Sequence, residues 1–191
     1  MFGRGAPGFA ARPVELAIPQ SRSAGRAAIF GLALAVACGG ISFDVSQDLP
    51  EQTVKGSPLG GILPSFFPSP IPLSIDLQAQ TQKMGTGPAQ HAYLKTLTLS
   101  ATPHATPSGN FDFLAEVHIF ISSPNNSSLP KVEIATLNPV PKGQTTISLT
   151  PQNVDLLPYI NAGAQIDSQA SGTQPKQDFT FDGVIVVTVK V

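Results

Sequence analysis

The side chains that could carry acid–base or metal chemistry are few in this sequence. Its three histidines, His91, His104 and His118, are spaced unlike the ligands of a zinc motif, and Cys38 is the single cysteine. The chain has no Gly-x-Ser-x-Gly segment, and no glycine-rich loop is followed by the Lys-Ser/Thr pair of phosphate-binding loops. The sequence therefore predicts no catalytic residue, no metal and no cofactor.

Three arrangements of acidic residues come nearest to a reactive site. His118 shares a strand face with Glu116, as an acid–base pair or surface metal site would, and Asp112 lies at an even spacing from Glu116, as paired catalytic carboxylates could. Asp178 and Asp182 suggest calcium in the same way, although the oxygen-rich loop that calcium needs is not evident. In each case a solvated polar strand face is the favoured interpretation over a hydrolase or metal enzyme.

The elements that would position these residues are β-strands. Apolar and polar residues alternate with period two, which places one parity in a core and the other in water. The segments with this alternation are 41–46, 73–79, 94–99, 115–122, 131–137, 145–149 and 164–170. A charged fraction of 12% and 19 prolines also favour short strands joined by turns over a helical bundle.

The strongest alternation lies in the last segment, residues 178–191. Asp182-Gly183 would ordinarily indicate a two-residue hairpin turn, but the apolar parity continues unchanged across it. The sequence predicts one long strand in which Gly183 marks a bulge or a close backbone approach, with a hairpin as the alternative.

Helix is expected only once, at 151–157. Thr150 could cap this helix, Pro151 would occupy its first turn, and Pro158 would end it. About seven to nine short strands with one short helix predict an all-β fold, an antiparallel β-sandwich.

Residues 56–72 contain five prolines, so this segment is unsuited to a central strand. Phe66 and Phe67 lie within it, and we expect them to plug one end of the sandwich. The alternative is that they contact a partner as an exposed aromatic tip, or border a ligand cavity between the two sheets.

A short apolar segment precedes the β-rich part of the chain. Residues 27–37 are apolar throughout, but a membrane-spanning helix needs about 20 such residues. Arg22 and Arg26 precede the segment and small residues end it, an order that is typical of a cleaved export signal. A retained anchor or a buried helix is the alternative, although the segment has no polar face.

The end of this segment, Ala35-Val36-Ala37-Cys38, resembles the lipobox of bacterial lipoproteins, in which small and aliphatic residues precede a cysteine. The resemblance implies that the sulfur of Cys38 carries a diacylglyceryl group, that the chain is cut before Cys38, and that the new amino terminus is acylated. Ala35 replaces the usual leucine. Ala35-Val36-Ala37 is also a small-x-small site, whose cleavage would instead release a soluble protein with a free thiol. A lone cysteine cannot form an internal disulfide.

The charges of the chain divide at the same point. All arginines precede Cys38, whereas acidic residues outnumber lysines after it. Such a division is typical of a targeting segment, and the lack of clustered basic residues opposes nucleic-acid binding. The sequence predicts an export signal at 1–37, a lipidated terminus with the first strand at 38–50, and one β-sandwich domain at 51–191.

We therefore expect a non-enzymatic lipoprotein, held in the cell envelope by membrane lipid through the acylated Cys38, with a structural or protein-interaction role and an envelope protein as partner. Gly39, where some lipoproteins have aspartate, favours the outer membrane. The body resembles bacterial lipoproteins with immunoglobulin-like or late-embryogenesis-type sandwiches, a resemblance that carries no activity with it. A periplasmic module that binds a small ligand or lipid is the alternative.

Overall fold

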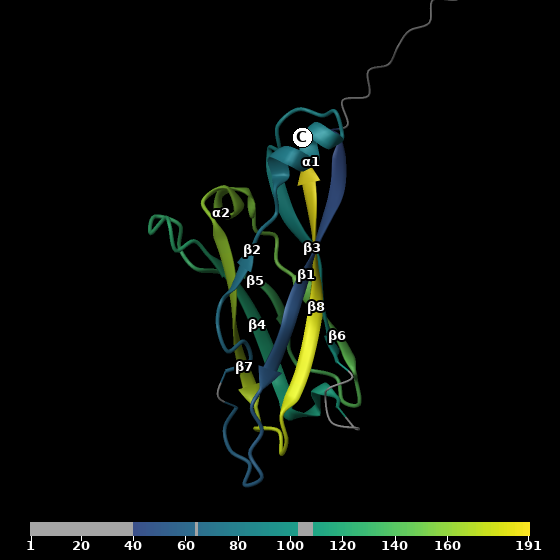
Figure 1. Cartoon of the computed structure of the whole chain (residues 1–191), viewed down its shortest axis with the longest axis vertical. Coiled ribbons are helices and arrows are strands. Elements are labelled where there is room, and N and C mark those ends of the chain that lie inside the picture. The colour runs from purple at the N-terminus through teal and green to yellow at the C-terminus, as the bar shows by residue number, and fades with distance from the viewer. Residues whose placement is uncertain (1–39, 64, 103–108) are drawn as a thin grey trace, which may run out of the picture. The chain divides into compact units, whose positions relative to one another are not determined.

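The computed structural model describes residues 40–63, 65–102 and 109–191, which form an antiparallel β fold (Figure 1). The strands pair in the order β1-β8-β3-β6-β5-β4-β7-β2. They are β1 (Ser42–Val54), β2 (Ile71–Leu73), β3 (His91–Ala101), β4 (Leu114–Ser122), β5 (Val132–Leu137), β6 (Thr146–Pro151), β7 (Ala164–Gly172) and β8 (Phe179–Lys190). The predicted antiparallel all-β fold is confirmed. The expected export signal, Cys38, Gly39 and His104 lie outside the described residues.

Two layers of strands enclose the core, and β6 passes from one layer to the other. Residues 146–149 of β6 pair with β3, whereas Thr150 and Pro151 pair with β5. β1, β8 and β3 form one layer, and β5, β4, β7 and β2 form the other (Figure 1). The buried residues of both layers, such as Ile185 and Val117, belong to one hydrophobic cluster. β1 crosses the boundary expected at residue 50, so the first strand is part of the same sheet.

β8 runs unbroken through Gly183, so the alternative of a hairpin at this position is wrong. A Cβ atom on Gly183 would lie 2.7 Å from the carbonyl oxygen of Thr98 and 2.7 Å from Cδ2 of Leu99, both on β3. On the other side of β8, β1 shifts register between Leu49 and Gln52, beside the position paired with Gly183. The close backbone approach expected at Gly183 is confirmed, and the register shift lies in its partner strand.

The predicted strand at 73–79 is wrong for most of its length. The edge strand β2 ends at Leu73, and a helix, α1 (Leu77–Lys83), follows. The Asp76 carboxylate accepts a hydrogen bond from the Ala79 N–H at 2.8 Å, and this cap satisfies a donor that the first helical turn leaves free. The cap therefore starts a helix where the alternation alone indicates a strand.

The helix predicted at 151–157 is displaced along the chain and is instead α2 (Leu157–Asn161). Pro151 ends β6, and Pro158 lies in the first helical turn rather than after the last one. Proline is tolerated there because the first N–H groups of a helix have no partner within it. None of the helices in the described ranges is long and apolar enough to cross a membrane.

One glutamine side chain joins β1 and β2, the two end strands of the sheet. Nε2 of Gln47 donates to the carbonyl oxygen of Pro72 at 3.1 Å, and Oε1 of Gln47 accepts from the N–H of Ser74 at 2.8 Å. The amide thereby makes bonds of the kind that a neighbouring strand would make. Proline has no N–H group to donate. Pro72 is tolerated in β2 because one side of this edge strand has no neighbouring strand that needs the donor.

Replacing Gly183 by alanine should lower the free energy of unfolding by about 1–3 kcal/mol, because the methyl group would overlap the backbone of β3. Urea unfolding followed by circular dichroism measures the change. Gly87→Ala is the control, since a Cβ atom at Gly87 meets nothing within 4 Å. Equal stabilities of the two variants would contradict the close approach.

Replacing Gln47 by methionine should lower the free energy of unfolding by about 1–2 kcal/mol, because two hydrogen bonds between the end strands are lost at nearly constant side-chain volume. Amide hydrogen exchange at Ser74 should accelerate. Gln82→Met, on the exposed side of α1, is the matched control. Unchanged exchange at Ser74 would show that the edge of β2 does not depend on Gln47.

Candidate functional site

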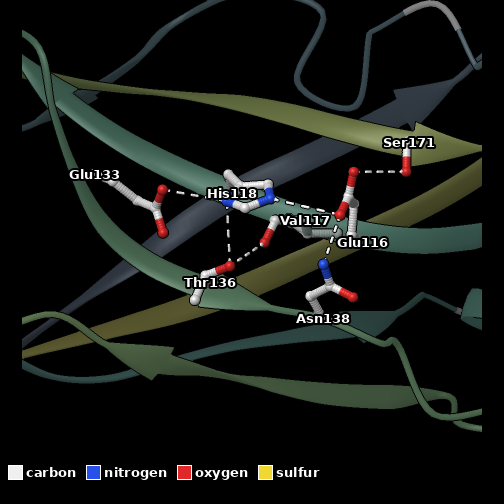
Figure 2. Close-up of polar contacts among 7 residues, drawn as sticks. All are labelled: Glu116, Val117, His118, Glu133, Thr136, Asn138 and Ser171. Atoms are coloured by element: carbon white, nitrogen blue, oxygen red, sulfur yellow. Dashed lines mark hydrogen bonds and ion pairs between the residues drawn. The ribbon is translucent and has the colours of Figure 1, made fainter.

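The polar residues of β4 lie in a cross-strand network with residues of β5 (Figure 2). Nδ1 of His118 lies 3.2 Å from Oε2 of Glu133 and 3.2 Å from Oγ1 of Thr136. Nε2 of His118 lies 3.8 Å from Oε2 of Glu116. The structure therefore brings together His118 and Glu116, as the sequence predicts, and adds a second carboxylate on the other side of the imidazole.

A register shift between β4 and β5 explains why sequence reasoning missed Glu133. Ile119 pairs with Ala135, but the next residue, Phe120, pairs with Glu133, so Ile134 is an extra residue in β5. Ile134 and Ala135 are both buried. Strict alternation would place Glu133 on the buried side with Ala135, and the extra residue moves it to the outer face beside His118.

Both carboxylate oxygens of Glu116 already have partners. Nδ2 of Asn138 donates to Oε2 of Glu116 at 2.6 Å, and Oγ of Ser171 donates to Oε1 at 3.0 Å (Figure 2). Oγ1 of Thr136 donates in turn to the carbonyl oxygen of Val117 at 3.3 Å. The network thus links β4 to β7 and to the segment after β5, which is a structural role for side chains on a sheet surface.

The network lacks the features of a reactive centre. His118, Glu116 and Glu133 are each about one third exposed, so their charges are screened by water. Within the described ranges, no group of three His, Cys, Asp or Glu side chains is placed to hold a metal ion. The geometry supports the favoured interpretation of a solvated polar strand face.

Asp112 does not join this network, and the prediction that it shares a strand face with Glu116 is wrong. It lies in a short 3₁₀ turn, Phe111–Phe113, that precedes β4, so it does not share a strand face with Glu116. Its carboxylate accepts the Gly143 N–H, and its carbonyl oxygen accepts a hydrogen bond from Nζ of Lys142 at 2.7 Å.

Asp178 is likewise engaged within the protein rather than with a cation. Its Oδ2 lies 2.8 Å from Nζ of Lys55, and its Oδ1 accepts the Gly56 N–H at 2.9 Å. The hydrogen bond from Lys55, followed by that from Gly56, holds the pKa of Asp178 below its usual value. A carboxylate neutralised by lysine is a poor calcium ligand, which opposes the calcium interpretation of Asp178 and Asp182.

Phe66 and Phe67 lie in the core rather than at an exposed tip. Their side chains are 1% and 4% exposed, and the ring of Phe66 stacks on Phe181 with centroids 4.5 Å apart. Phe111 meets the same ring edge-on at 6.5 Å. The interpretation of an exposed aromatic tip is therefore wrong, because both rings bury more apolar area against β8 than a surface position would allow.

Two hollows of the described surface are candidates for a ligand, and neither is lined by Phe66 or Phe67. The larger, about 490 Å³, lies between β2, the β4–β5 connection and the start of β7. Its lining is Pro72, Leu73, Ser74, Ile75, Asp76, Pro124, Asn125, Ile160, Gly163, Ala164 and Gln165. The smaller, about 260 Å³, lies between α1 and α2. The lining of the larger hollow mixes polar and apolar groups. It therefore differs from the apolar cavity between the two sheets that the sequence suggested.

A second histidine–carboxylate pair has no signal in the sequence, because its partners are 64 residues apart. Nδ1 of His91 lies 2.7 Å from Oδ2 of Asp155, whose Oδ1 accepts the N–H groups of Ala92 and Leu157, each at 3.0 Å. Burial raises the pKa of Asp155, but the hydrogen bonds from His91, Ala92 and Leu157 outweigh burial and hold it below its usual value. The pair ties the start of β3 to the start of α2.

No protein-family model matches the chain, and no curated protein matches it. Among solved structures, a chain from Desmodium yellow mottle tymovirus aligns with 98% of this chain and 96% of its own length, at 10% sequence identity and a TM-score of 0.25. A likeness at this TM-score carries no argument about fold or function.

Replacing Asp155 by asparagine should lower the free energy of unfolding at pH 7 by about 1–2 kcal/mol, because a charged acceptor of three hydrogen bonds is lost. Since the pKa of Asp155 is lowered by folding, its contribution is present above the unfolded pKa of about 4 and is lost as the pH falls through the folded value. The difference between the two proteins should therefore shrink below pH of about 4.

Urea unfolding at pH 7 and at pH of about 3 measures this difference. Asp48→Asn, at an exposed position of β1, is the control and should change stability little at either pH. A difference between wild type and Asp155→Asn that stays constant with pH would contradict the assignment.

Proposed function

We propose that this chain is a lipid-anchored protein of the bacterial cell envelope, whose β domain acts as a structural or protein-interaction module without catalysis. One observation carries the proposal: β1, the first strand of the described fold, begins at Ser42, so every described strand lies after the cysteine of the lipobox-like sequence. Residues 1–37 would then be a separable export signal, and cleavage before Cys38 would leave the whole β fold intact.

The short distance from Cys38 to the sheet supports direct attachment to a membrane. β1 begins at Ser42, and the chain from Cys38 to Ser42 can span at most about 14 Å. Each buried methylene of an acyl chain contributes about 0.8 kcal/mol to membrane binding, so two or three chains on one residue would hold the domain durably. The end of the domain that begins β1 would then lie close to the bilayer.

The polar side chains support a role without catalysis. Glu116, His118 and Glu133 bond to one another or to neighbouring strands, and neither of the two hollows includes them. A general acid or base must reach a bound substrate, and these side chains lie on a strand face instead.

A module that binds a small ligand is the second candidate, and the hollow of about 490 Å³ favours it. Its size falls within the range of about 300–1,000 Å³ for small-molecule sites. Asn125 and Gln165 would supply amide groups to a polar ligand there. The open, mixed lining makes this candidate weaker than the interaction module.

Replacing Cys38 by alanine should move the protein from the membrane fraction to the soluble fraction of lysed cells, because the acylated sulfur is the expected anchor. Ser42→Ala, at the exposed start of β1, is the control and should stay with the membrane. Mass spectrometry of the amino-terminal peptide should show acyl chains on Cys38. An unmodified thiol, or wild-type protein in the soluble fraction, would overturn the anchor.

A further inference from the structure

The end of the domain at which β1 begins presents two exposed large apolar side chains. Ile41, just before β1, is 59% exposed, and Met84, just after α1, is 55% exposed. α1, the start of β1 and the end of β8 lie together at this end (Figure 1). With the neighbouring exposed lysines, Lys83 and Lys190, these side chains make up what we call the anchor face.

The chain between Cys38 and the anchor face is short. Ile41 is three residues after Cys38, a stretch that spans at most about 11 Å. An acylated sulfur would lie where the hydrocarbon of the bilayer meets the headgroups, and the headgroup layer on each side is about 5–8 Å thick. Ile41 would therefore be within reach of the bilayer interface, whatever other partner the domain has.

Backbone hydrogen bonds fix Ile41 to the folded domain. The N–H of Val191 donates to the carbonyl oxygen of Ile41 at 3.0 Å, and Ser42 then pairs with Lys190 at the end of β8. The N–H of Gln90 donates to the carbonyl oxygen of Lys190 at 2.8 Å, which ties the connection after α1 to the same strand end. Ile41 is thus part of an ordered surface and not of a loose tether.

Met84 ends α1 in a Schellman motif. The N–H of Thr86 donates to the carbonyl oxygen of Thr81 at 3.0 Å. The N–H of Gly85 donates to that of Gln82, also at 3.0 Å. Gly85 has a φ angle of +65°, which this motif requires and which glycine adopts without strain. The backbone of Met84 is therefore fixed, and an ordered turn presents its exposed side chain.

The two lysines of the anchor face have no acidic partner among the described residues. Lys83 directly precedes Met84, and Nζ of Lys190 lies 5.0 Å from the centre of the Tyr93 ring. Lysine can place its methylene groups along an apolar surface while its ammonium group reaches lipid phosphates. Tyrosine likewise suits the level of the headgroups, because its ring is apolar and its hydroxyl is polar.

The carboxylates near the anchor face are engaged within the protein. Oδ2 of Asp44 lies 2.5 Å from Nζ of Lys95, and Oδ2 of Asp155 lies 2.7 Å from Nδ1 of His91. Asp76 caps the first turn of α1, at the opposite end of that helix from Met84. These contacts leave the two apolar side chains as the groups that gain most from contact with lipid.

We infer that the anchor face docks on the bilayer itself, with Ile41 and Met84 inserted at the level of the headgroups. The inference rests on the proposed function, because the acylated Cys38 brings this face to the membrane. It goes beyond attachment by a tether, since it fixes the orientation of the domain. β1 then leads away from the bilayer, and the far end of the domain, about 40 Å along this strand, faces the surroundings.

The tether makes so small a contact sufficient. Burial of a partly exposed aliphatic side chain strengthens binding by about tenfold, which would not hold a free domain on a bilayer. A short flexible link raises the effective concentration of the second contact to about the millimolar range. Two inserted side chains are then enough to favour the docked orientation over free rotation about Cys38.

The test uses the full chain, acylated in cells and reconstituted in vesicles of phosphatidylethanolamine and phosphatidylglycerol. Cys38 is the single cysteine, and its lipid would block it, so Met84→Cys supplies one free thiol for the environment-sensitive dye NBD. The dye should emit as in an apolar medium, and spin-labelled lipids should quench it. Leu59→Cys, at a 98% exposed position beyond the far end of β1, is the matched control. Its dye should emit as in water and be quenched at least about fivefold less.

A second substitution separates docking from mere proximity. Ile41→Ser in the chain labelled at position 84 should shift the emission toward that of water, because one of the two inserted side chains is lost. The protein should stay with the vesicles, since its acyl chains are unchanged. Ile62→Ser, at an exposed position of the far end, should leave the emission unaltered. Thermal unfolding should show that both serine variants keep the stability of the labelled parent.

The outcomes distinguish the docking from the anchor. Water-like emission at position 84 in protein that floats with the vesicles would overturn the docked face and leave the anchor intact. Equal quenching at positions 84 and 59 would overturn it too, because the domain would then lie along the bilayer. Protein that does not float, or whose amino-terminal peptide carries no acyl chain, would remove the anchor and the docking together.

Discussion

The packing of Phe66 against Phe181 is the contact on which the arrangement of this domain depends. The ring centroids are 4.5 Å apart and the ring planes differ by 3°. Phe181 belongs to β8 in one layer, and the N–H of the adjacent Phe67 donates to Oγ of Ser168 on β7, in the other layer, at 2.8 Å. The segment between β1 and β2 is therefore held by both layers at once, which fixes the loop before the aromatic pair and the edge strand after it.

The link between the two end strands, β1 and β2, depends on the position of this segment. β2 has only three residues, and a pairing of that length is marginal by itself. It lies within reach of Gln47 because Phe66 and Phe67 hold the preceding chain in the core. The amide of Gln47 then satisfies the Pro72 carbonyl and the Ser74 N–H. The unpaired edge of β1 could otherwise pair with a strand of another chain. The side chain of Gln47 joins this edge to β2 without an additional strand.

The sequence is informative where one physical effect dominates and uninformative where two compete. The course of β8 could be predicted because a buried face forces alternation through Gly183. The helix α1 could not be predicted, because its cap, Asp76, lies in a segment whose apolar residues also alternate as in a strand. The position of Glu133 on the outer face could not be predicted, because one extra residue in β5 moves its side chain to the other face. The period of a strand does not reveal where its register shifts. The outward position of Leu59 depends on backbone bonds to a segment more than a hundred residues away in sequence.

The polar network and the exposed side chains of Leu59 and Ile62 differ in what a partner protein could gain from each. The carboxylate of Glu116 already accepts hydrogen bonds from Asn138 and Ser171, so a partner would exchange existing bonds for new ones at little net benefit. Leu59 and Ile62 make no such exchange, because their side chains lie in water on an ordered loop. Covering these side chains would release water without breaking internal contacts. This gain is larger than the net gain from exchanging hydrogen bonds at Glu116, and it is less specific. The sequence reveals the residue types of the polar network directly, whereas the exposure of aliphatic side chains such as Leu59 and Ile62 is decided by the fold.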